Sequence, residues 1–144
     1  MISIVSPAKS LDFNTKAPIE KHSHSVFLNQ SQQLVNVLSD YSPQELSELM
    51  KISADLGLLN ANRYQDWKTP FNLKNAKQAV YSFTGDVYKG LDANTLSPKA
   101  IDYAQTNFKI ISGLYGILKP LDLIQAYRLE MGTKIQIYDK RSLY

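Results

Sequence analysis

Residues 112–122 read SGLYGILKPLD, and the rest of the chain is best interpreted around this stretch. It follows an apolar run at residues 108–111, which is typical of a buried strand or of the end of a buried helix. Gly113 and Gly116 permit positive φ angles and close backbone approach, and Pro120 ends regular structure. The spacing therefore predicts a tight apolar turn. Such a turn is either a close-packed corner, which the spacing alone favours, or a loop whose backbone N–H groups bind a phosphate.

The composition predicts one domain spanning residues 1–144. The chain has 144 residues and 44% hydrophobic residues, enough for a real core. It contains no cysteine, which excludes disulfides and thiolate chemistry. The N-terminus lacks the features of a signal peptide, and no apolar run approaches the roughly 20 residues of a membrane helix. We therefore expect a soluble, cytoplasmic protein with no membrane association.

The charge is mildly basic and is carried mostly by lysine. The net charge is +3, with 13 lysines against 3 arginines. Lysine neutralises phosphates as a point charge, whereas reading of base edges favours arginine. If the chain binds nucleic acid, this balance favours contact with the phosphate backbone over sequence readout.

Alternating apolar patterns and helix caps predict an α/β or α+β fold with a mixed sheet and flanking helices. The clearest local signals are two serines followed by proline, Ser42 and Ser97, where serine caps a helix and proline occupies its first position. The predicted strands lie at residues 2–5 (buried), 79–83, 108–111 and 134–138. The predicted helices lie at residues 26–38, 43–50, 53–64, 73–78 and 98–107.

Three segments at predicted strand ends carry the unusual residues: 6–12, 85–91 (expected to be a loop) and 112–128. Open α/β sheets place ligands at the carboxyl ends of strands, so these segments are expected to converge on one cleft. A strand-exit loop with a solvated lysine remains an equally good interpretation of the first segment. His22 and His24 lie in a polar loop without nearby metal-ligand partners, so we predict no metal site and no cofactor.

The same segments resemble the signatures of the YaaA peroxide-stress-response family. The matching stretches are IVSPAKSLD at residues 4–12, GDVYKGL at 85–91 and ISGLYGILKPLDLIQAYRLEM at 111–131. Two departures are mild: Ala126 stands where the family usually has proline, and Ser10 where it often has threonine. Family members continue well beyond this length. The resemblance therefore covers an N-terminal portion, and we expect an incomplete fold with open edges and apolar faces.

The resemblance implies a cytoplasmic bacterial protein that limits oxidative damage linked to intracellular iron. It also implies non-sequence-specific binding of double-stranded or distorted DNA, through a positively charged cleft and a helix-hairpin-helix-like element in an unusual α/β fold. We map that hairpin to the turn between Gly113 and Gly116. The predicted DNA- or phosphate-binding residues are Lys9, Lys89, Gly113, Gly116, Lys119, Tyr127 and Arg128.

The alternative hypothesis is an enzyme acting on a nucleotide or another phosphorylated small molecule. Lys9 and Arg128 would then bind the anion. The acid/base candidates are Asp86, Asp122 and Glu130, and the residues expected to stack or donate hydrogen bonds are Tyr88, Tyr115 and Tyr127. No complete catalytic signature is present in the sequence, so no catalytic residue is assigned. Direct iron binding is disfavoured, because the sequence has no cysteine and no clustered histidine and carboxylate set. The oligomeric state is not predicted.

Overall fold

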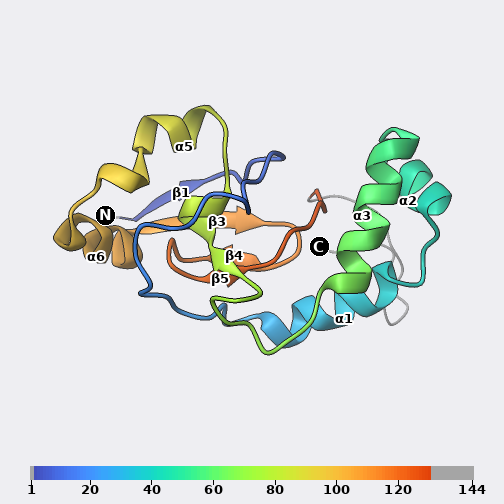
Figure 1. The fold of residues 1–144 in the computed structure, drawn as a ribbon, viewed down its shortest axis with the longest axis horizontal. Coiled ribbons are helices and arrows are strands. Elements are labelled where there is room, and N and C mark those ends of the chain that lie inside the picture. Colours follow the sequence, from blue (N-terminus) through green and yellow to red (C-terminus); the bar gives the residue numbers. More distant parts are fainter. Residues whose placement is uncertain (1, 131–144) are drawn as a thin grey trace. The chain divides into compact units, whose positions relative to one another are not determined.

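The computed structural model describes residues 2–130, and these form two compact units that interleave along the sequence. The first unit contains residues 2–26, 70–111 and 116–126, and it holds the strands (Figure 1). The second unit contains residues 27–69, 112–115 and 127–130, and it holds three helices. The combination of helices and a mixed sheet confirms the α+β form of the prediction. The strand predicted at 134–138 lies outside the described residues.

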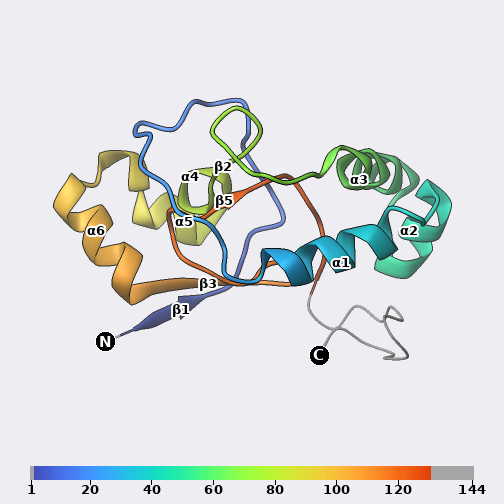
Figure 2. The same cartoon turned by 90° about the horizontal axis from the view of Figure 1, so that it is seen from below.

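The larger sheet of the first unit has the strand order β1-β3-β4. β1 (Ser3–Val5) pairs in parallel with β3 (Phe108–Ser112), with Ser3 opposite Phe108 and Val5 opposite Ile110. Figures 1 and 2 show these two strands side by side. β4 (Gly116–Leu118) follows β3 after only residues 113–115, and so short a connection requires the antiparallel direction. The sheet is therefore mixed, as predicted.

The strand predicted at residues 2–5 exists, but the prediction that it is buried was wrong. Ile2 and Ile4 are 62% and 60% exposed. β1 is an edge strand that pairs only with β3, and no described element covers these two apolar side chains. An edge strand with apolar residues in solvent is what we expect of an incomplete fold.

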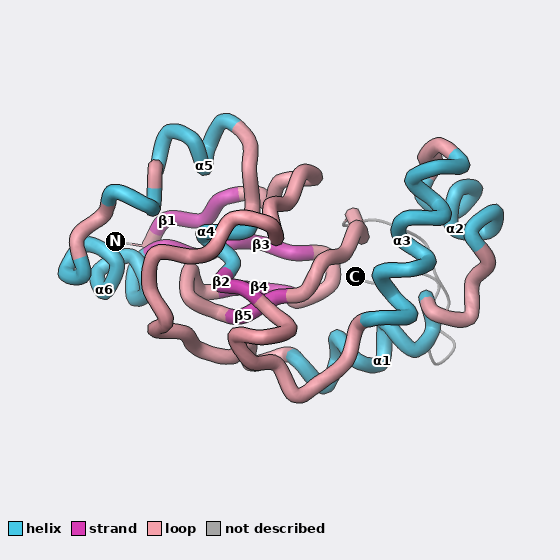
Figure 3. Tube along the Cα trace, viewed as in Figure 1, coloured by secondary structure: helices cyan, strands magenta, loops and turns pink. Residues whose placement is uncertain are grey.

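A second prediction was wrong at residues 73–83, where the sequence predicted a helix at 73–78 followed by a strand at 79–83, and the structure has a short strand followed by a helical turn. Asn72 Oδ1 accepts hydrogen bonds from the amides of Lys74 and Asn75, so it caps a turn and not a helix. β2 (Lys77–Gln78) then pairs antiparallel with β5 (Leu123–Ile124). The predicted strand at 79–83 is instead one helical turn, α4 (Ala79–Ser82), coloured as helix in Figure 3. A short, fully buried apolar run suits either structure, and periodicity does not separate the two.

The loop predicted at 85–91 was also wrong, because α5 (Asp86–Leu91) occupies this segment. Gly85 precedes the helix with φ 123°, a conformation suited to glycine. A helix of six residues that contains Gly90 is too short to show helical periodicity in the sequence. A 3₁₀ turn, η1 (Ala93–Thr95), follows it.

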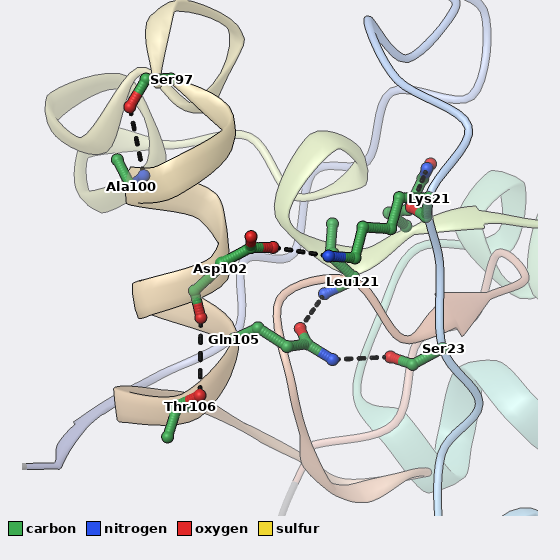
Figure 4. A network of polar contacts seen from close by, with 9 residues as sticks. Lys21, Ser23, Ser97, Ala100, Asp102, Gln105, Thr106 and Leu121 are labelled. Carbon is green, nitrogen blue, oxygen red and sulfur yellow. Dashed lines mark hydrogen bonds and ion pairs between the residues drawn. The ribbon is translucent and has the colours of Figure 1, made fainter.

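α6 (Pro98–Asn107) begins where the serine-proline signal predicted, and Ser97 Oγ accepts the amide of Ala100 at 3.1 Å. Gln105 on this helix donates to Ser23 Oγ at 2.8 Å and accepts the amide of Leu121 at 2.9 Å (Figure 4). α6 is thereby tied to two distant segments of the first unit. Ile101 of this helix belongs to a hydrophobic cluster of the unit, together with Val80, Tyr81, Ala93 and Leu121.

The second unit contains α1 (Leu28–Leu38), α2 (Pro43–Met50) and α3 (Ala54–Asp66). The predicted capping box is present: Ser42 Oγ accepts the amide of Glu45 at 3.1 Å, and Glu45 Oε1 accepts the amide of Ser42 at 3.0 Å. α2 and α3 pack closely, because a Cβ at Gly57 would lie 2.5 Å from the Pro43 carbonyl oxygen. All three helices were predicted to within a few residues.

Candidate functional site

Two of the three predicted segments meet in the first unit. The amide of Thr84 donates to the Ser10 carbonyl at 3.0 Å, and the Tyr88 hydroxyl donates to the Ser6 carbonyl at 2.8 Å. A Cβ placed on Gly85 would lie 3.6 Å from the Ala8 Cβ, so the segment 6–10 lies against the start of α5. The expected convergence is confirmed for these two segments.

This meeting point presents two lysines, one on each segment. Lys9 and Lys89 are both exposed, and we call the surface formed by residues 6–10 and 85–89 the Lys9–Lys89 surface. Tyr88 anchors it from beneath. Burial raises the pKa of Tyr88, so its hydroxyl remains a neutral hydrogen-bond donor. The surface thus rests on a fixed internal support, and its two lysines are exposed.

Lys119 lies at the other end of the same sheet. β1 and β3 are parallel, and Lys9 follows the carboxyl end of β1. β4 runs in the opposite direction, so Lys119, which follows β4, lies at the end of the sheet where β1 and β3 begin. Lys119 is exposed, and its amide donates to Asp122 Oδ2 at 2.9 Å. The structure therefore does not bring Lys119 together with Lys9 and Lys89.

Of the carboxylates proposed for acid/base chemistry, Asp122 is buried and fully engaged. It is 2% exposed, and Oδ1 accepts the Ser23 hydroxyl at 2.6 Å while Oδ2 accepts the Lys119 amide. Its main-chain carbonyl also accepts the amide of Ala79. These contacts make Asp122 a bridge between three segments of the first unit. Asp86 is exposed in the first turn of α5.

The turn after β3 belongs to the second unit and is a close-packed corner. Ser112 Oγ accepts the amides of Leu114 and Tyr115 at 3.3 and 3.0 Å and is 2.7 Å from the Tyr127 hydroxyl. A Cβ on Gly113 would lie 1.9 Å from the Leu129 carbonyl oxygen. Two amides of the turn are therefore engaged with its own serine, and Gly113 gives close approach to the chain's own backbone.

The mapping of a helix-hairpin-helix element to this turn was wrong. The turn joins strand β3 to strand β4, and Gly116, at φ 78°, starts the second strand in the left-handed region. Glycine is needed there by the geometry of a strand-to-strand corner. Among the described elements, α2 and α3 form a helical hairpin; residues 51–53 join them, and Lys51 in this turn has φ 56°.

Tyr127 and Arg128 lie on the segment that closes this corner. Tyr127 is 6% exposed and packs edge-on against Tyr115, with ring centroids 5.2 Å apart. The Arg128 carbonyl accepts the Tyr64 hydroxyl, and the Arg128 side chain, 18% exposed, has Nη2 3.7 Å from Glu130 Oε1. Tyr127 thus serves packing, and Arg128 retains only limited access to solvent.

Sequence reasoning missed Arg63, which lies on α3 in the same unit. Its Nη1 donates to Asn60 Oδ1 at 3.2 Å and to the Tyr127 carbonyl at 3.5 Å. Burial lowers the pKa of Arg63, and the charge of Arg128 contributes a smaller effect in the same direction. An arginine on the apolar side of a helical pattern was the available signal.

Sequence reasoning also missed Lys77, which is buried in the first unit at 8% exposure. Its Nζ donates to the carbonyls of Asp12 and Thr15 at 2.9 and 2.5 Å. Hydrogen bonds from Thr15, and then from the Asn14 amide, lower the pKa of the Asp12 carboxyl to about 2. A lysine inside the otherwise buried run 76–83 was the sequence signal for this arrangement.

Comparisons with known proteins place the chain in context. A family model described as "Peroxide stress protein YaaA" matches residues 1–144. Proteins named UPF0246 from Hahella chejuensis, Chromobacterium violaceum and Pseudoalteromonas translucida are 53%, 51% and 51% identical over the whole chain. The chain spans about 56% of the length of each of these relatives. Within residues 2–130, no helix has the length and apolarity to cross a bilayer, and no three histidine, cysteine or acidic residues gather as a metal site.

Proposed function

This chain belongs to the peroxide stress protein YaaA family, and we propose that it binds double-stranded or distorted DNA through phosphate contacts without reading base sequence. The observation that supports this most directly is the Lys9–Lys89 surface. Two exposed lysines from distant parts of the sequence are carried there by segments that hydrogen-bond to each other.

The chemistry of this surface suits a phosphate backbone. Lysine binds phosphates as a point charge, and the charge excess of the chain is carried by lysine. Backbone contacts fix the position of a protein on a duplex without carrying sequence information. Binding that does not depend on sequence follows from such contacts.

The α2–α3 hairpin is a weaker candidate for the DNA contact. Its turn carries one lysine, Lys51, and three acidic residues, Glu45, Glu48 and Asp55, lie on the two helices, whereas the Lys9–Lys89 surface has two lysines and one exposed acidic residue, Asp86. Acidic side chains next to a helix-hairpin turn oppose the approach of phosphates. We therefore assign the contact to the Lys9–Lys89 surface.

The test is fluorescence anisotropy of a short labelled duplex at several salt concentrations. Each neutralised phosphate contributes a slope of about 0.9 to the fall of log affinity with log salt. The Lys9→Ala/Lys89→Ala variant should therefore have a slope smaller by roughly 2. A Lys68→Ala/Lys99→Ala variant removes the same charge from exposed positions elsewhere and should keep the slope of the unchanged chain. Equal slopes for the two double variants would refute the assignment, and affinity independent of salt would refute phosphate binding itself.

A further inference from the structure

The sheet β1-β3-β4 has two faces of different character. On one face, Ser3 of β1 and Phe108 of β3 border an apolar hollow together with Leu91 and Leu96, which lie in and after α5. This is the side of the sheet that the helices of the first unit cover. Figure 2 shows α4, α5 and α6 on one side of β1 and β3, and no described element of the first unit on the other side.

The other face of the sheet carries isoleucines. Side chains alternate along a strand, so Ile2 and Ile4 point away from the face that carries Ser3. Lys109 lies opposite Ile4 on β3, and residue 111 follows it on the same face. On β4, residue 118 is fully buried, so residue 117 lies on the other face. We call this surface the isoleucine face, and it is formed by Ile2, Ile4, Ile111 and Ile117.

The isoleucine face is largely open to solvent. Ile2, Ile4 and Ile117 are 62%, 60% and 50% exposed, and Ile111 is half-buried. Single exposed apolar residues are normal on a protein surface, but these lie on three neighbouring strands. β1 and β3 are also a parallel pair, and parallel strands occur in sheets whose two faces are both covered. The face therefore has the composition and the setting of a buried layer.

The longer relatives contain a segment that can cover it. The proteins from Hahella chejuensis and Chromobacterium violaceum match this chain over all 144 residues, and the chain spans about 56% of each. Slightly less than half of each relative therefore has no counterpart in these 144 residues. We call that part the additional portion of the relatives. It is tethered to the matching part, so its effective concentration at the face is on the order of millimolar.

A second copy of this chain fits the face less well. A symmetric pair uses the same surface on both copies, so each copy would bring its Lys109 into the contact. Like charges across an interface oppose association. A second copy also lacks the tether that raises the concentration of the additional portion.

We propose that the isoleucine face is the docking surface for the additional portion of the longer family proteins, which contacts it through an apolar surface. Docking buries the four isoleucines and covers the second face of the parallel pair. The isoleucine face shares no residue with the Lys9–Lys89 surface. This proposal and DNA binding therefore fail or succeed separately.

The test uses the absence of cysteine from this chain, because a single introduced cysteine then reports the accessibility of its own position. Ile117→Cys places the thiol on the isoleucine face. Val87→Cys, at a position that is also 50% exposed but lies on α5, is the matched control. The same two positions are substituted in the full-length Hahella chejuensis protein, and maleimide labelling of each site is followed by peptide mass spectrometry.

In the 144-residue chain, the two cysteines should react at rates within about threefold of each other. In the full-length relative, the cysteine at the position of Ile117 should react about tenfold or more slowly than in the chain, and the one at the position of Val87 should keep its rate. Circular dichroism checks that each variant is folded. If Ile117→Cys is not, Ile4→Cys, at a 60% exposed position of the same face, replaces it.

Two results in the relative would overturn the proposal: a cysteine on the face that reacts as fast as in the 144-residue chain, or equal slowing at the control position. Size-exclusion chromatography with light scattering tests the second copy. If the 144-residue chain is a dimer and its own Ile117→Cys is about tenfold slower than Val87→Cys, a second copy covers the face and the proposal is also overturned.

Discussion

Gly113→Ala is the substitution whose cost the structure defines best. The new Cβ would lie 1.9 Å from the Leu129 carbonyl oxygen and 2.8 Å from its carbonyl carbon. Both are backbone atoms, so no side-chain rotation relieves the clash. Ordinary contact begins near 3.4 Å, so the two backbones must separate by about 1.5 Å.

That separation also removes hydrogen bonds that hold the same segment. Tyr127 is bonded to Ser112 at 2.7 Å, and the Arg128 carbonyl accepts the buried Tyr64 hydroxyl. Overpacking costs about 1–3 kcal/mol, and each hydrogen bond contributes about 1 kcal/mol. We expect Gly113→Ala to lower the free energy of unfolding by about 3–5 kcal/mol.

The matched control is Gly90→Ala. A Cβ at Gly90 meets no atom within 4 Å, and Gly90 lies in α5. Alanine in a helix is favoured over glycine by about 0.5–1 kcal/mol, so this variant should be slightly stabilised.

Urea unfolding monitored by tryptophan fluorescence measures both variants. Trp67 is the single tryptophan, is 4% exposed, and donates to the Tyr115 hydroxyl at 2.9 Å, so its emission reports on this corner. If the free energies of unfolding of the Gly113→Ala and Gly90→Ala variants differ by less than about 1 kcal/mol, the argument that the backbone at Gly113 is in direct contact with that at Leu129 is refuted.

Three further predictions concern acid stability, the buried tyrosine and Lys119. The pKa of Asp12 is lowered to about 2 in the folded chain, so its stabilising effect is present above pH 4 and is lost as the pH falls toward 2. Urea midpoints between pH 5 and pH 2 should therefore fall less steeply for Asp12→Asn than for the unchanged chain, and parallel curves would contradict this. Tyr64→Phe leaves the Arg128 carbonyl without its donor and should cost about 1–3 kcal/mol in urea unfolding, whereas Tyr103→Phe, at a 66% exposed position, should change it by less than about 0.5 kcal/mol. Lys119→Ala should change DNA affinity in the anisotropy assay less than Lys9→Ala does, because Lys119 lies at the opposite edge of its sheet; a larger effect of Lys119→Ala would move the DNA surface to that edge.

The parts of the fold that the sequence predicted well depend on contacts between near neighbours. The capping box at Ser42 and the serine cap at Ser97 involve residues three positions apart, so the sequence alone contains both partners. Residues 79–83 behave differently. The amides of Ala79 and Val80 donate to carbonyls of Asp122 and Pro120, some forty residues away. Local patterns carry no information on such bonds, and the helical turn there was predicted as a strand.

The sequence likewise predicted only part of the candidate site. Lys9 and Lys89 were selected because they follow predicted strands, and the structure carries them on segments that meet. Lys77 and Gln78 were missed because their character depends on burial under residues 12–21, which lie more than fifty residues earlier. The burial of an ammonium against carbonyl oxygens, or of an amide oxygen without a donor, is a property of three-dimensional packing.

The stretch richest in family signature, residues 112–122 with its continuation to 129, is mostly interior. Ser112, Tyr115 and Tyr127 are bonded to one another or to Trp67, and Gly113 is in backbone contact with Leu129. Substitutions there act on stability first. A loss of DNA binding in a Gly113 variant is therefore informative only when tryptophan fluorescence shows the variant to be folded. Lys9 and Lys89 are exposed, so replacing them is expected to change affinity at constant stability. Stability and affinity measured on the same variants thus separate the residues that stabilise the fold from those proposed to bind DNA.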